Sequence, residues 1–406
     1  MECGVGSKKL NIAIIISSEL KTAGMYQYEY KILDILKKYH KDQDIKLKFY
    51  GFSKNIRKDY IDLNLDIKFI SENIFQKTYR YCLSNFFFTK IFSKIKIGFS
   101  YIEKQLKKDE IYLVYFLGPN SISYGLSNMP YIFTLLDLGH LDILEFPELS
   151  YDGAFNKREF LYSKSLKKSF RVIVDLEWGK KNAIKRYNLD EKRIVVLKLL
   201  PNIKINKTEA FIRIKEKYKL KNDYIFYPAN FWAHKNHMYI LRTIKILRDE
   251  KNIDIDVIFS GSREGNLEYI LDKAKELKID DLIHYIGFVP NEEIPNLYKQ
   301  SLSLVMPTYL GPTNIPPLEA FAYETPVCYS DLPYFREQVG DSAFFMDLSD
   351  PYSLVKILLT IQNDKQIVDE KKKKGIQVLK NWNEEDFYKK LLDIFNEYKY
   401  VRELWK

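Results

Sequence analysis

A short run of basic and polar residues follows an apolar segment in the second half of the chain. The run PANFWAHKNH, residues 228–237, holds Asn230, Lys235 and two histidines, His234 and His237. A lysine directly before a helix N-terminus can neutralise a phosphate, helped by free backbone N–H groups and the helix dipole. No acid or cysteine accompanies the histidines, so structural hydrogen bonding is favoured over metal binding. The run therefore predicts a phosphate contact at Lys235 and no metal site.

A second run, YLGPTNIPPLEAFAYETPV at residues 309–327, places two prolines at the start of an expected helix over 315–323. Proline is tolerated there because its missing N–H has no partner within the helix. The remaining backbone donors form a small positive cup that fits a diphosphate, at Thr313, Asn314, Ile315 and Leu318. Glu319 lies one turn in, and its carboxylate can accept from both vicinal hydroxyls of a ribose. The alternative is an ordinary strand, loop and helix with a solvated glutamate.

A third candidate lies in the first half, in LLDLGHLDILEFPE at residues 135–148. Asp137 and His140 follow an expected strand over 131–137, three positions apart. Such a pair can bind sugar hydroxyls at a strand end and take part in catalysis. Alternatively, Asp137 caps the next turn and His140 packs in the interior. The residues leave both interpretations open.

A glycine precedes the first expected helix, over about 25–40. Gly24 stands in the loop SSELKTAGMYQYEY, residues 17–30, after an apolar strand over 10–16. A glycine at this place allows the backbone to approach a ligand closely. The signal is weak, and it adds Gly24 to the predicted ligand-binding residues.

The bulk composition limits the class of protein. The 406 residues exceed what one hydrophobic core serves, which predicts two domains. The net charge of +10 favours anionic partners such as phosphorylated small molecules, although a lysine-rich proteome gives the same excess. Three scattered cysteines favour a reducing cytoplasm. The apolar run over 12–16 is too short for a signal peptide, and no run approaches the roughly 18 apolar residues that span a bilayer.

Short apolar strands alternate with longer amphipathic helices in both halves, which is typical of parallel α/β sheets. The expected strands cover 10–16, 45–52, 111–118, 131–137, 170–175, 194–200, 223–229, 255–261, 282–288, 302–308, 325–330 and 342–347. Further helices are expected over 236–250, 264–278 and 384–404. We predict an N-terminal Rossmann-like domain over 1–203, a C-terminal one over 204–383, and a last helix over 384–406 that packs back on the N-terminal domain. Ligands bind at the carboxyl ends of strands in such sheets.

One basic segment suggests a membrane contact. Residues 77–108 carry one acid, Glu103, and an apolar stripe at helical spacing: Phe88, Ile91, Phe92, Ile95, Phe99 and Ile102. Lysines flank the stripe at positions 90, 94 and 96. A basic amphipathic helix of this kind can lie on an anionic membrane. The alternative is a helix that faces the core with a solvated basic side.

Several of these runs together resemble one known family. The run GPTNIPPLEAFAYETPVCYSDLPYFREQVGDSAFFMDLSDP, residues 311–351, looks like the C-terminal signature of the retaining glycosyltransferases of family 4. Four further runs resemble the same family, at residues 135–148, 226–237, 257–262 and 285–308. The resemblance covers about residues 10–385. It implies the GT-B fold, with two doubly wound Rossmann-like domains facing across a cleft.

The resemblance also implies roles for single residues. Lys235 matches the lysine of the family's basic pair, whereas the arginine position falls on Asn230. The base-binding segment matches GFVPNEEI, residues 287–294, with Val289 as the expected contact. Glu319 matches the second glutamate of the paired motif, which holds the ribose. The first glutamate falls on Gly311, so a carboxylate near the donor sugar is missing.

The implied function is transfer of a sugar from a nucleotide-sugar donor to a saccharide or lipid-linked acceptor, with retention at the anomeric carbon. The donor is a substrate, and no cofactor or metal is implied. The family places this work in bacterial surface polysaccharide assembly, in the cytoplasm or at the inner face of the membrane. Alternatives are a non-catalytic scaffold of the same fold and an isomerase or phosphorylase. Nucleic-acid binding is disfavoured because no recognised motif appears.

Overall fold

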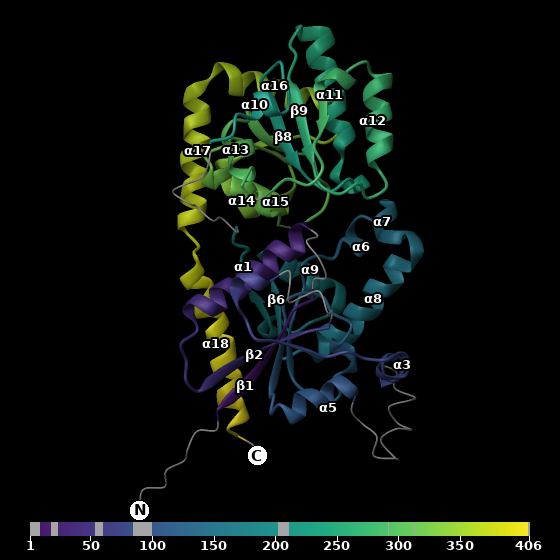
Figure 1. The fold of residues 1–406 in the computed structure, drawn as a ribbon, viewed down its shortest axis with the longest axis vertical. Helices are drawn as coiled ribbons and strands as arrows, with labels where there is room; N and C mark the ends of the chain where they lie inside the picture. The colour runs from purple at the N-terminus through teal and green to yellow at the C-terminus, as the bar shows by residue number, and fades with distance from the viewer. Residues whose placement is uncertain are drawn as a thin grey trace, which may run out of the picture. The chain divides into compact units, whose positions relative to one another are not determined.

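The structure, a computed structural model, describes residues 9–17, 23–52, 60–83, 100–201, 211–290, 292–311 and 313–404. The chain folds into two compact units. The first unit comprises residues 1–138, 155–199 and 384–406. The second comprises residues 139–154 and 200–383. Each unit is built on its own parallel sheet, and Figure 1 labels the helices and strands of both.

The first unit holds a seven-stranded parallel sheet in the order β3-β2-β1-β4-β5-β6-β7. Its strands are β1 (Leu10–Ile15), β2 (Ile45–Gly51), β3 (Ile67–Phe69), β4 (Leu113–Phe116), β5 (Tyr131–Thr134), β6 (Arg171–Val174) and β7 (Ile194–Val196). Every residue of β1 is buried. A parallel strand covered on both faces favours such a continuous apolar run over alternation.

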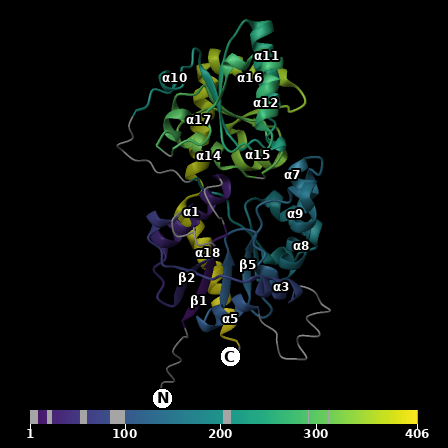
Figure 2. The same cartoon turned by 45° about the vertical axis from the view of Figure 1, so that its right-hand side comes forward.

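Helices of the first unit connect these strands and cover the sheet (Figure 2). They are α1 (Ala23–Tyr39), α3 (Ile74–Leu83), α5 (Tyr101–Lys108), α8 (Ala154–Ser165), α9 (Glu177–Tyr187) and α18 (Glu384–Arg402). The last helix returns to this unit from the far end of the sequence and packs beside α1. Lys31 on α1 forms an ion pair with Glu384 at the start of α18, with 2.5 Å between Nζ and Oε1.

The second unit holds a six-stranded parallel sheet in the order β10-β9-β8-β11-β12-β13. Its strands are β8 (Tyr224–Pro228), β9 (Asp256–Ser260), β10 (Ile283–Tyr285), β11 (Ser303–Met306), β12 (Val327–Ser330) and β13 (Phe344–Met346). Its helices are α6 (Gly139–Asp142), α7 (Pro147–Ser150), α10 (Ile214–Lys217), α11 (His237–Lys251), α12 (Leu267–Glu276), α13 (Ile294–Lys299), α14 (Ile315–Ala322), α15 (Pro333–Val339), α16 (Pro351–Asn363) and α17 (Lys365–Lys380).

The predicted class, two doubly wound parallel sheets, is confirmed. Each of the twelve predicted strands corresponds to a strand of the structure, which adds β3, residues 67–69. The three-residue strand IKF is too short and too polar to stand out as an apolar run. The division into compact units places residues 139–154 with the second sheet. The domain boundaries at 203 and 383 stay a prediction.

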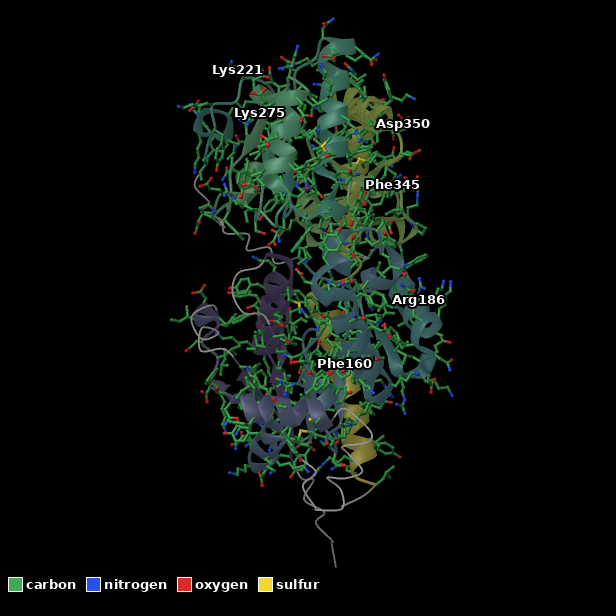
Figure 3. All side chains as sticks on the ribbon, turned by 90° about the vertical axis from the view of Figure 1, so that its right-hand side faces the viewer. Phe160, Arg186, Lys221, Lys275, Phe345 and Asp350 are labelled. Atoms are coloured by element: carbon green, nitrogen blue, oxygen red, sulfur yellow. The ribbon has the colours of Figure 1, made fainter. Side chains whose placement is uncertain are left out.

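Exposed basic side chains occur in both units. Arg186 of the first unit and Lys221 and Lys275 of the second are exposed, and Figure 3 shows them on the surface of the chain. The apolar stripe expected on residues 88–99 lies outside the described residues. Ile102, its last member, is fully buried in α5. The membrane contact therefore stays a prediction.

Candidate functional site

The strand order of the second sheet reverses between β8 and β11. Ligands of open parallel α/β sheets bind at such a switch point, beyond the carboxyl ends of the strands. The loop after β8 lies against the loop after β9, because Asn230 Oδ1 accepts from the Ser262 N–H at 3.0 Å. Gly261 permits this approach, since a Cβ there would stand 2.6 Å from the Ala229 carbonyl oxygen. Asn230 thus joins two loops at the position where the resemblance expected an arginine.

Lys235 lies at the end of a short 3-10 turn, Ala233–Lys235, between β8 and α11. Asn236 then takes a left-handed conformation with φ of 55°, and α11 begins at His237. The Tyr227 hydroxyl donates to the Lys235 carbonyl at 2.8 Å and fixes the turn to β8. The Lys235 Nζ lies 3.4 Å from Asn314 Oδ1, in the loop before α14. The structure therefore brings the predicted phosphate contact to the predicted diphosphate cup.

Asn314 stands at the N-cap position of α14, but its side chain makes no capping hydrogen bond. Its Nδ2 donates to the Gly311 carbonyl at 3.0 Å and to the Tyr329 hydroxyl at 2.8 Å. Its backbone N–H donates to Gln338 Oε1 at 3.3 Å, and Gln338 Nε2 donates back to the Asn314 carbonyl at 2.6 Å. One of the predicted backbone donors is therefore occupied by a side chain of α15. Ile315 is buried at the first helical position.

Gly311, where the resemblance expected a glutamate, has a conformation that explains its type. Its φ of +102° is rarely adopted by residues with a side chain, and a Cβ would stand 2.9 Å from Asn314 Oδ1. The Asn314 side chain thus folds over the position from which a carboxylate would project. The loop is built around the glycine, and the amide of Asn314 occupies the space beside it.

Glu319 is partly buried on α14, one turn from the helix start. Its Oε2 accepts a hydrogen bond of 2.9 Å from the hydroxyl of Tyr298, a buried residue of α13. Burial raises the pKa of the Glu319 carboxyl to about 7, and the Tyr298 hydrogen bond opposes that rise. A partly buried carboxylate with this pKa favours partners that donate hydrogen bonds. The glutamate is therefore not the solvated one of the alternative interpretation.

A pair that the sequence did not predict lies beside Lys235. Both the backbone N–H and the ring Nδ1 of His234 contact Glu148 Oε1, and the N–H is at 2.9 Å. Burial raises the pKa of Glu148, but the hydrogen bonds with His234 outweigh it and leave the pKa below its ordinary value. Phe146 packs edge-on against His234 and also contacts Tyr309. No sequence signal links residues 86 positions apart, so only the fold reveals this pair.

His237 lies in an aromatic cluster of the core. It is fully buried and stacks on Phe231 with ring centroids 4.1 Å apart, while Tyr227 and Phe259 complete the cluster. Burial lowers the pKa of His237 to about 3 and keeps the ring neutral. Among the residues that the structure describes, no group of three His, Cys, Asp or Glu side chains lies close enough to hold a metal ion.

The remaining predicted residues belong to both units. Asp137 belongs to the first unit, where its Oδ1 pairs with Arg158 at 2.9 Å. His140 is fully buried in α6, which belongs to the second unit. Gly24 is exposed at the start of α1, and Val289 is half-buried after β10. Thr313 is half-buried beside Asn314. Their roles in binding or catalysis stay predictions.

The fold matches solved structures over nearly the whole chain. A glycosyltransferase of Rickettsia africae superposes with a TM-score of 0.68 at 17% identity, covering 96% of this chain and 98% of that one. Anabaena Alr3699/HepE in complex with UDP and glucose gives 0.71 at 12% identity, covering 96% and 100%. The fold of this chain is therefore GT-B, the class that the resemblance implied.

Sequence comparison gives a more specific match than the fold does, and the family match covers the C-terminal part of the chain. Residues 208–385 match the model of the glycosyl transferases group 1. The O-antigen chain mannosyltransferase RfbU of Salmonella typhimurium is 28% identical over 203 residues, 50% of this chain and 54% of the relative. The O-antigen chain mannosyltransferase B of Escherichia coli is 25% identical over 229 residues, 55% and 60% of the two chains. The matches thus span little more than half the length of these curated relatives.

Proposed function

We propose that the protein is a glycosyltransferase that moves a hexosyl group from a nucleotide-sugar donor to a saccharide or lipid-linked acceptor. The observation that carries this proposal is the meeting of Lys235 with the start of α14, where Nζ lies 3.4 Å from Asn314 Oδ1. This arrangement puts a positive charge at the helix N-terminus and at the switch point of the second sheet. Both features favour a bound diphosphate.

The chemical step follows from where negative charge develops. As the bond between the sugar and the diphosphate breaks, the leaving oxygen gains charge, and Lys235 stabilises it. Retention without a covalent intermediate requires the acceptor to enter on the face that the diphosphate leaves. The departing phosphate oxygen then takes the acceptor proton, so no enzymic nucleophile is needed. We take the retaining, metal-independent course from the resemblance to family 4.

The relatives suggest a setting for the reaction. Two of them are named as O-antigen chain mannosyltransferases, which supports a role in surface polysaccharide assembly and makes mannose the first donor sugar to test. A solved relative binds UDP and glucose, which supports a nucleotide-sugar donor in general. We therefore propose a panel of donors that includes UDP- and GDP-linked hexoses.

Product analysis tests the proposal. The purified chain is incubated with each nucleotide sugar, with and without simple glycoside acceptors, and released nucleoside diphosphate is quantified. We expect release with one donor, and proton NMR at early times should show a product with the donor's anomeric configuration. No release with any donor would contradict the enzymatic assignment, and an inverted product would contradict retention.

A non-catalytic scaffold is the second candidate. Gly311 and Asn230 stand where the resemblance expects a glutamate and an arginine, and both are bound into the loops by hydrogen bonds. A chain that binds nucleotides but neither transfers nor hydrolyses any sugar would favour this candidate. Measurable hydrolysis of one donor excludes it.

Peripheral binding to an anionic membrane is proposed for residues 77–108, beside a lipid-linked acceptor. Within the described residues, no helix combines the length and apolar character needed to span a bilayer. Sedimentation with liposomes tests the contact. Binding only to vesicles that contain anionic lipid is expected, and equal binding to neutral vesicles would contradict it.

A further inference from the structure

A cavity of about 390 Å³ lies in the first unit, at the amino ends of three neighbouring strands. Its lining comprises residues 127–130 before β5, residues 168–170 before β6, Arg171 as the first residue of β6, and Arg193 before β7. Open parallel sheets bind their usual ligands at the opposite edge, beyond the carboxyl ends of the strands. The chemistry of the lining, and not the fold, therefore decides what this cavity can bind.

Three cationic side chains line the cavity: Lys168, Arg171 and Arg193. Lys168 and Arg193 are exposed, so a ligand can reach them from solvent. Lys168 Nζ donates to the Leu126 carbonyl. Arg193 Nη1 donates to the Ser169 carbonyl at 3.5 Å. Among the residues that the structure describes, neither cation forms an ion pair, so two positive charges border the cavity without a carboxylate in contact with them.

The two acids around the cavity are engaged elsewhere. Glu397 of α18 pairs with Arg171, with 3.1 Å between Oε2 and Nε, so Arg171 adds little net charge. Glu103 of α5 is fully buried, and its carboxylate accepts the Ser127 N–H at 2.7 Å and the Asn128 N–H at 3.0 Å. Figure 1 shows α5 and the end of α18 at the same end of the first unit. The cavity there keeps an excess of positive charge.

The ammonium of Lys168 is partly withdrawn from water although the residue as a whole is exposed. Desolvation lowers the pKa of Lys168, and the charge of Glu103 opposes this without cancelling it. A charge with incomplete hydration gains more from a bound anion than a fully solvated one does, because less water must be displaced. The cavity thus favours an anionic ligand over a neutral or cationic one.

The geometry of the donors favours a phosphate group among possible anions. A guanidinium fork can bind two phosphate oxygens, while an ammonium contacts a third as a point charge. Ser127 and Asn128 also line the cavity and add neutral donors. These groups come from the ends of three different strands. A tetrahedral phosphate offers oxygens in several directions, whereas a planar carboxylate offers only two.

The size of the cavity leaves room for more than the phosphate itself. One buried water needs only roughly 10–15 Å³ of such space. Apolar surface comes from Met129, Pro130 and Phe170. We propose that the cavity binds a phosphate ester, with Lys168 and Arg193 on the phosphate and the organic part against Phe170. A soluble phosphate ester and a phospholipid headgroup share this chemistry. The site is independent of the proposed donor site.

Calorimetry on the full chain tests the inference and separates the two sources. The soluble probe is glycerol 3-phosphate, with glycerol as its uncharged comparison. The lipid probe is a phosphatidylcholine vesicle that contains phosphatidic acid, with pure phosphatidylcholine as its comparison. We expect saturable binding of at least one phosphate probe and none of either comparison. Binding of glycerol 3-phosphate would identify a soluble ester, and binding of the phosphatidic acid vesicles alone would identify a headgroup.

Four variants assign the binding to this cavity. Lys168→Gln and Arg193→Gln each remove one charge-assisted contact, so the affinity for the phosphate probe should fall about ten- to a hundredfold. Lys167→Gln and Lys192→Gln are the matched controls, because they remove the same charge one position away, at exposed residues outside the lining. The controls should bind as the wild type does. Arg193→Gln should fold normally, since the residue is exposed and its one hydrogen bond is long.

The outcomes distinguish this site from the donor site. All four variants should keep the wild-type affinity for nucleoside diphosphates. Absence of binding by both phosphate probes would overturn the inference. Equal losses in the cavity variants and their controls would also overturn it, because the binding would then follow net charge alone. Absence of nucleoside diphosphate binding by the wild-type chain would instead contradict the proposed function.

Discussion

Lys235 is the residue on which the proposed chemistry depends most. Replacement by alanine removes a preorganised charge from the diphosphate, and turnover should fall by about 10²–10³-fold. Folding should be retained, because the side chain projects from a loop whose backbone is held by Tyr227. Steady-state release of nucleoside diphosphate at saturating donor measures the effect.

Two further variants sharpen this prediction. Lys235→Arg keeps the charge and should lose less activity than the alanine variant. Lys356→Ala removes an exposed lysine of α16 in the same unit and should behave as the wild type. If the alanine variant at 235 turned over at the wild-type rate, the lysine would not contact the leaving group.

Glu319 should make the affinity for a nucleotide sugar depend on pH. Its pKa is raised to about 7 by burial, whereas ribose hydroxyls donate to the ionised form, so binding must lower that pKa. Affinity for a nucleotide sugar should therefore rise as the pH increases from about 5.5 through 7, and then level off. Binding should release protons at a pH slightly below 7. Calorimetry in buffers of different ionisation enthalpy measures both effects, because the diphosphate of a nucleotide sugar does not titrate there.

Two substitutions separate this role from a structural one. Glu319→Gln should weaken binding of the nucleoside diphosphate and the nucleotide sugar equally, by about ten- to a hundredfold, and remove the proton release. Tyr298→Phe removes a hydrogen bond that favours the carboxylate, so the pH dependence should move upward. Normal nucleotide binding by the glutamine variant, with a loss only when the sugar is attached, would mean that Glu319 contacts the sugar instead.

At the scale of elements, the loop before α14 is built around Gly311. Gly311→Ala puts a Cβ at a φ of +102° and 2.9 Å from Asn314 Oδ1, which should destabilise the chain by about 1–3 kcal/mol. Gly24→Ala is the matched control, since nothing lies within 4 Å of a Cβ there and the residue is in a helix. That control should stabilise by about 0.4–1 kcal/mol. Denaturant unfolding compares the two, and equal effects would contradict the account of the loop.

The sequence predicted the elements of this site better than their contacts. Continuous apolar runs identified the strands before residues 228–237 and 307–314, because parallel strands buried on both faces have such runs. The pairing of Glu148 with His234 was not predictable, because it joins a loop of the first half to the second sheet. Nor could spacing show that Gln338 occupies the Asn314 N–H. Such contacts depend on side-chain packing between elements distant in the sequence.

At the scale of the whole molecule, the last helix belongs to the first unit although the family match ends at residue 385. Its buried side chains are Phe387, Tyr388, Leu391, Ile394, Phe395 and Tyr398. Burying each large apolar side chain is worth about 1.5–3 kcal/mol, so deletion of residues 384–406 should unfold the first unit. Proteolysis of the shortened chain should cleave the first unit and spare the second. If both units of the shortened chain resisted the protease as well as they do in the wild-type chain, the proposed contribution of this helix to the first unit would be contradicted.

The pH dependence of stability tests the packing of α18 on α1 without removing the helix. Burial raises the pKa of Glu384, but Lys31 and Lys38 outweigh it and lower the pKa to about 2. This group therefore stabilises the fold fully above its ordinary pKa of 4.5, and the contribution is lost as the pH falls toward about 2. Glu384→Gln should lower the melting temperature at neutral pH and differ little from the wild type near the lowered pKa.

The two-sheet organisation of the chain was predictable because each half repeats the alternation of apolar strands and amphipathic helices. The assignment of residues 139–154 to the second unit was not, since nothing in their composition distinguishes them from a loop of the first sheet.

A crystal structure of the chain with its nucleoside diphosphate tests the central claim most directly. A thermal-shift panel of nucleoside diphosphates selects the ligand, because a ligand that binds the native state raises its melting temperature. We predict a phosphate oxygen within hydrogen-bonding distance of Lys235 Nζ at the start of α14, and ribose hydroxyls on the carboxylate of Glu319. A nucleotide bound elsewhere, with Lys235 still on Asn314 and Glu319 still on Tyr298 alone, would contradict the proposed donor site.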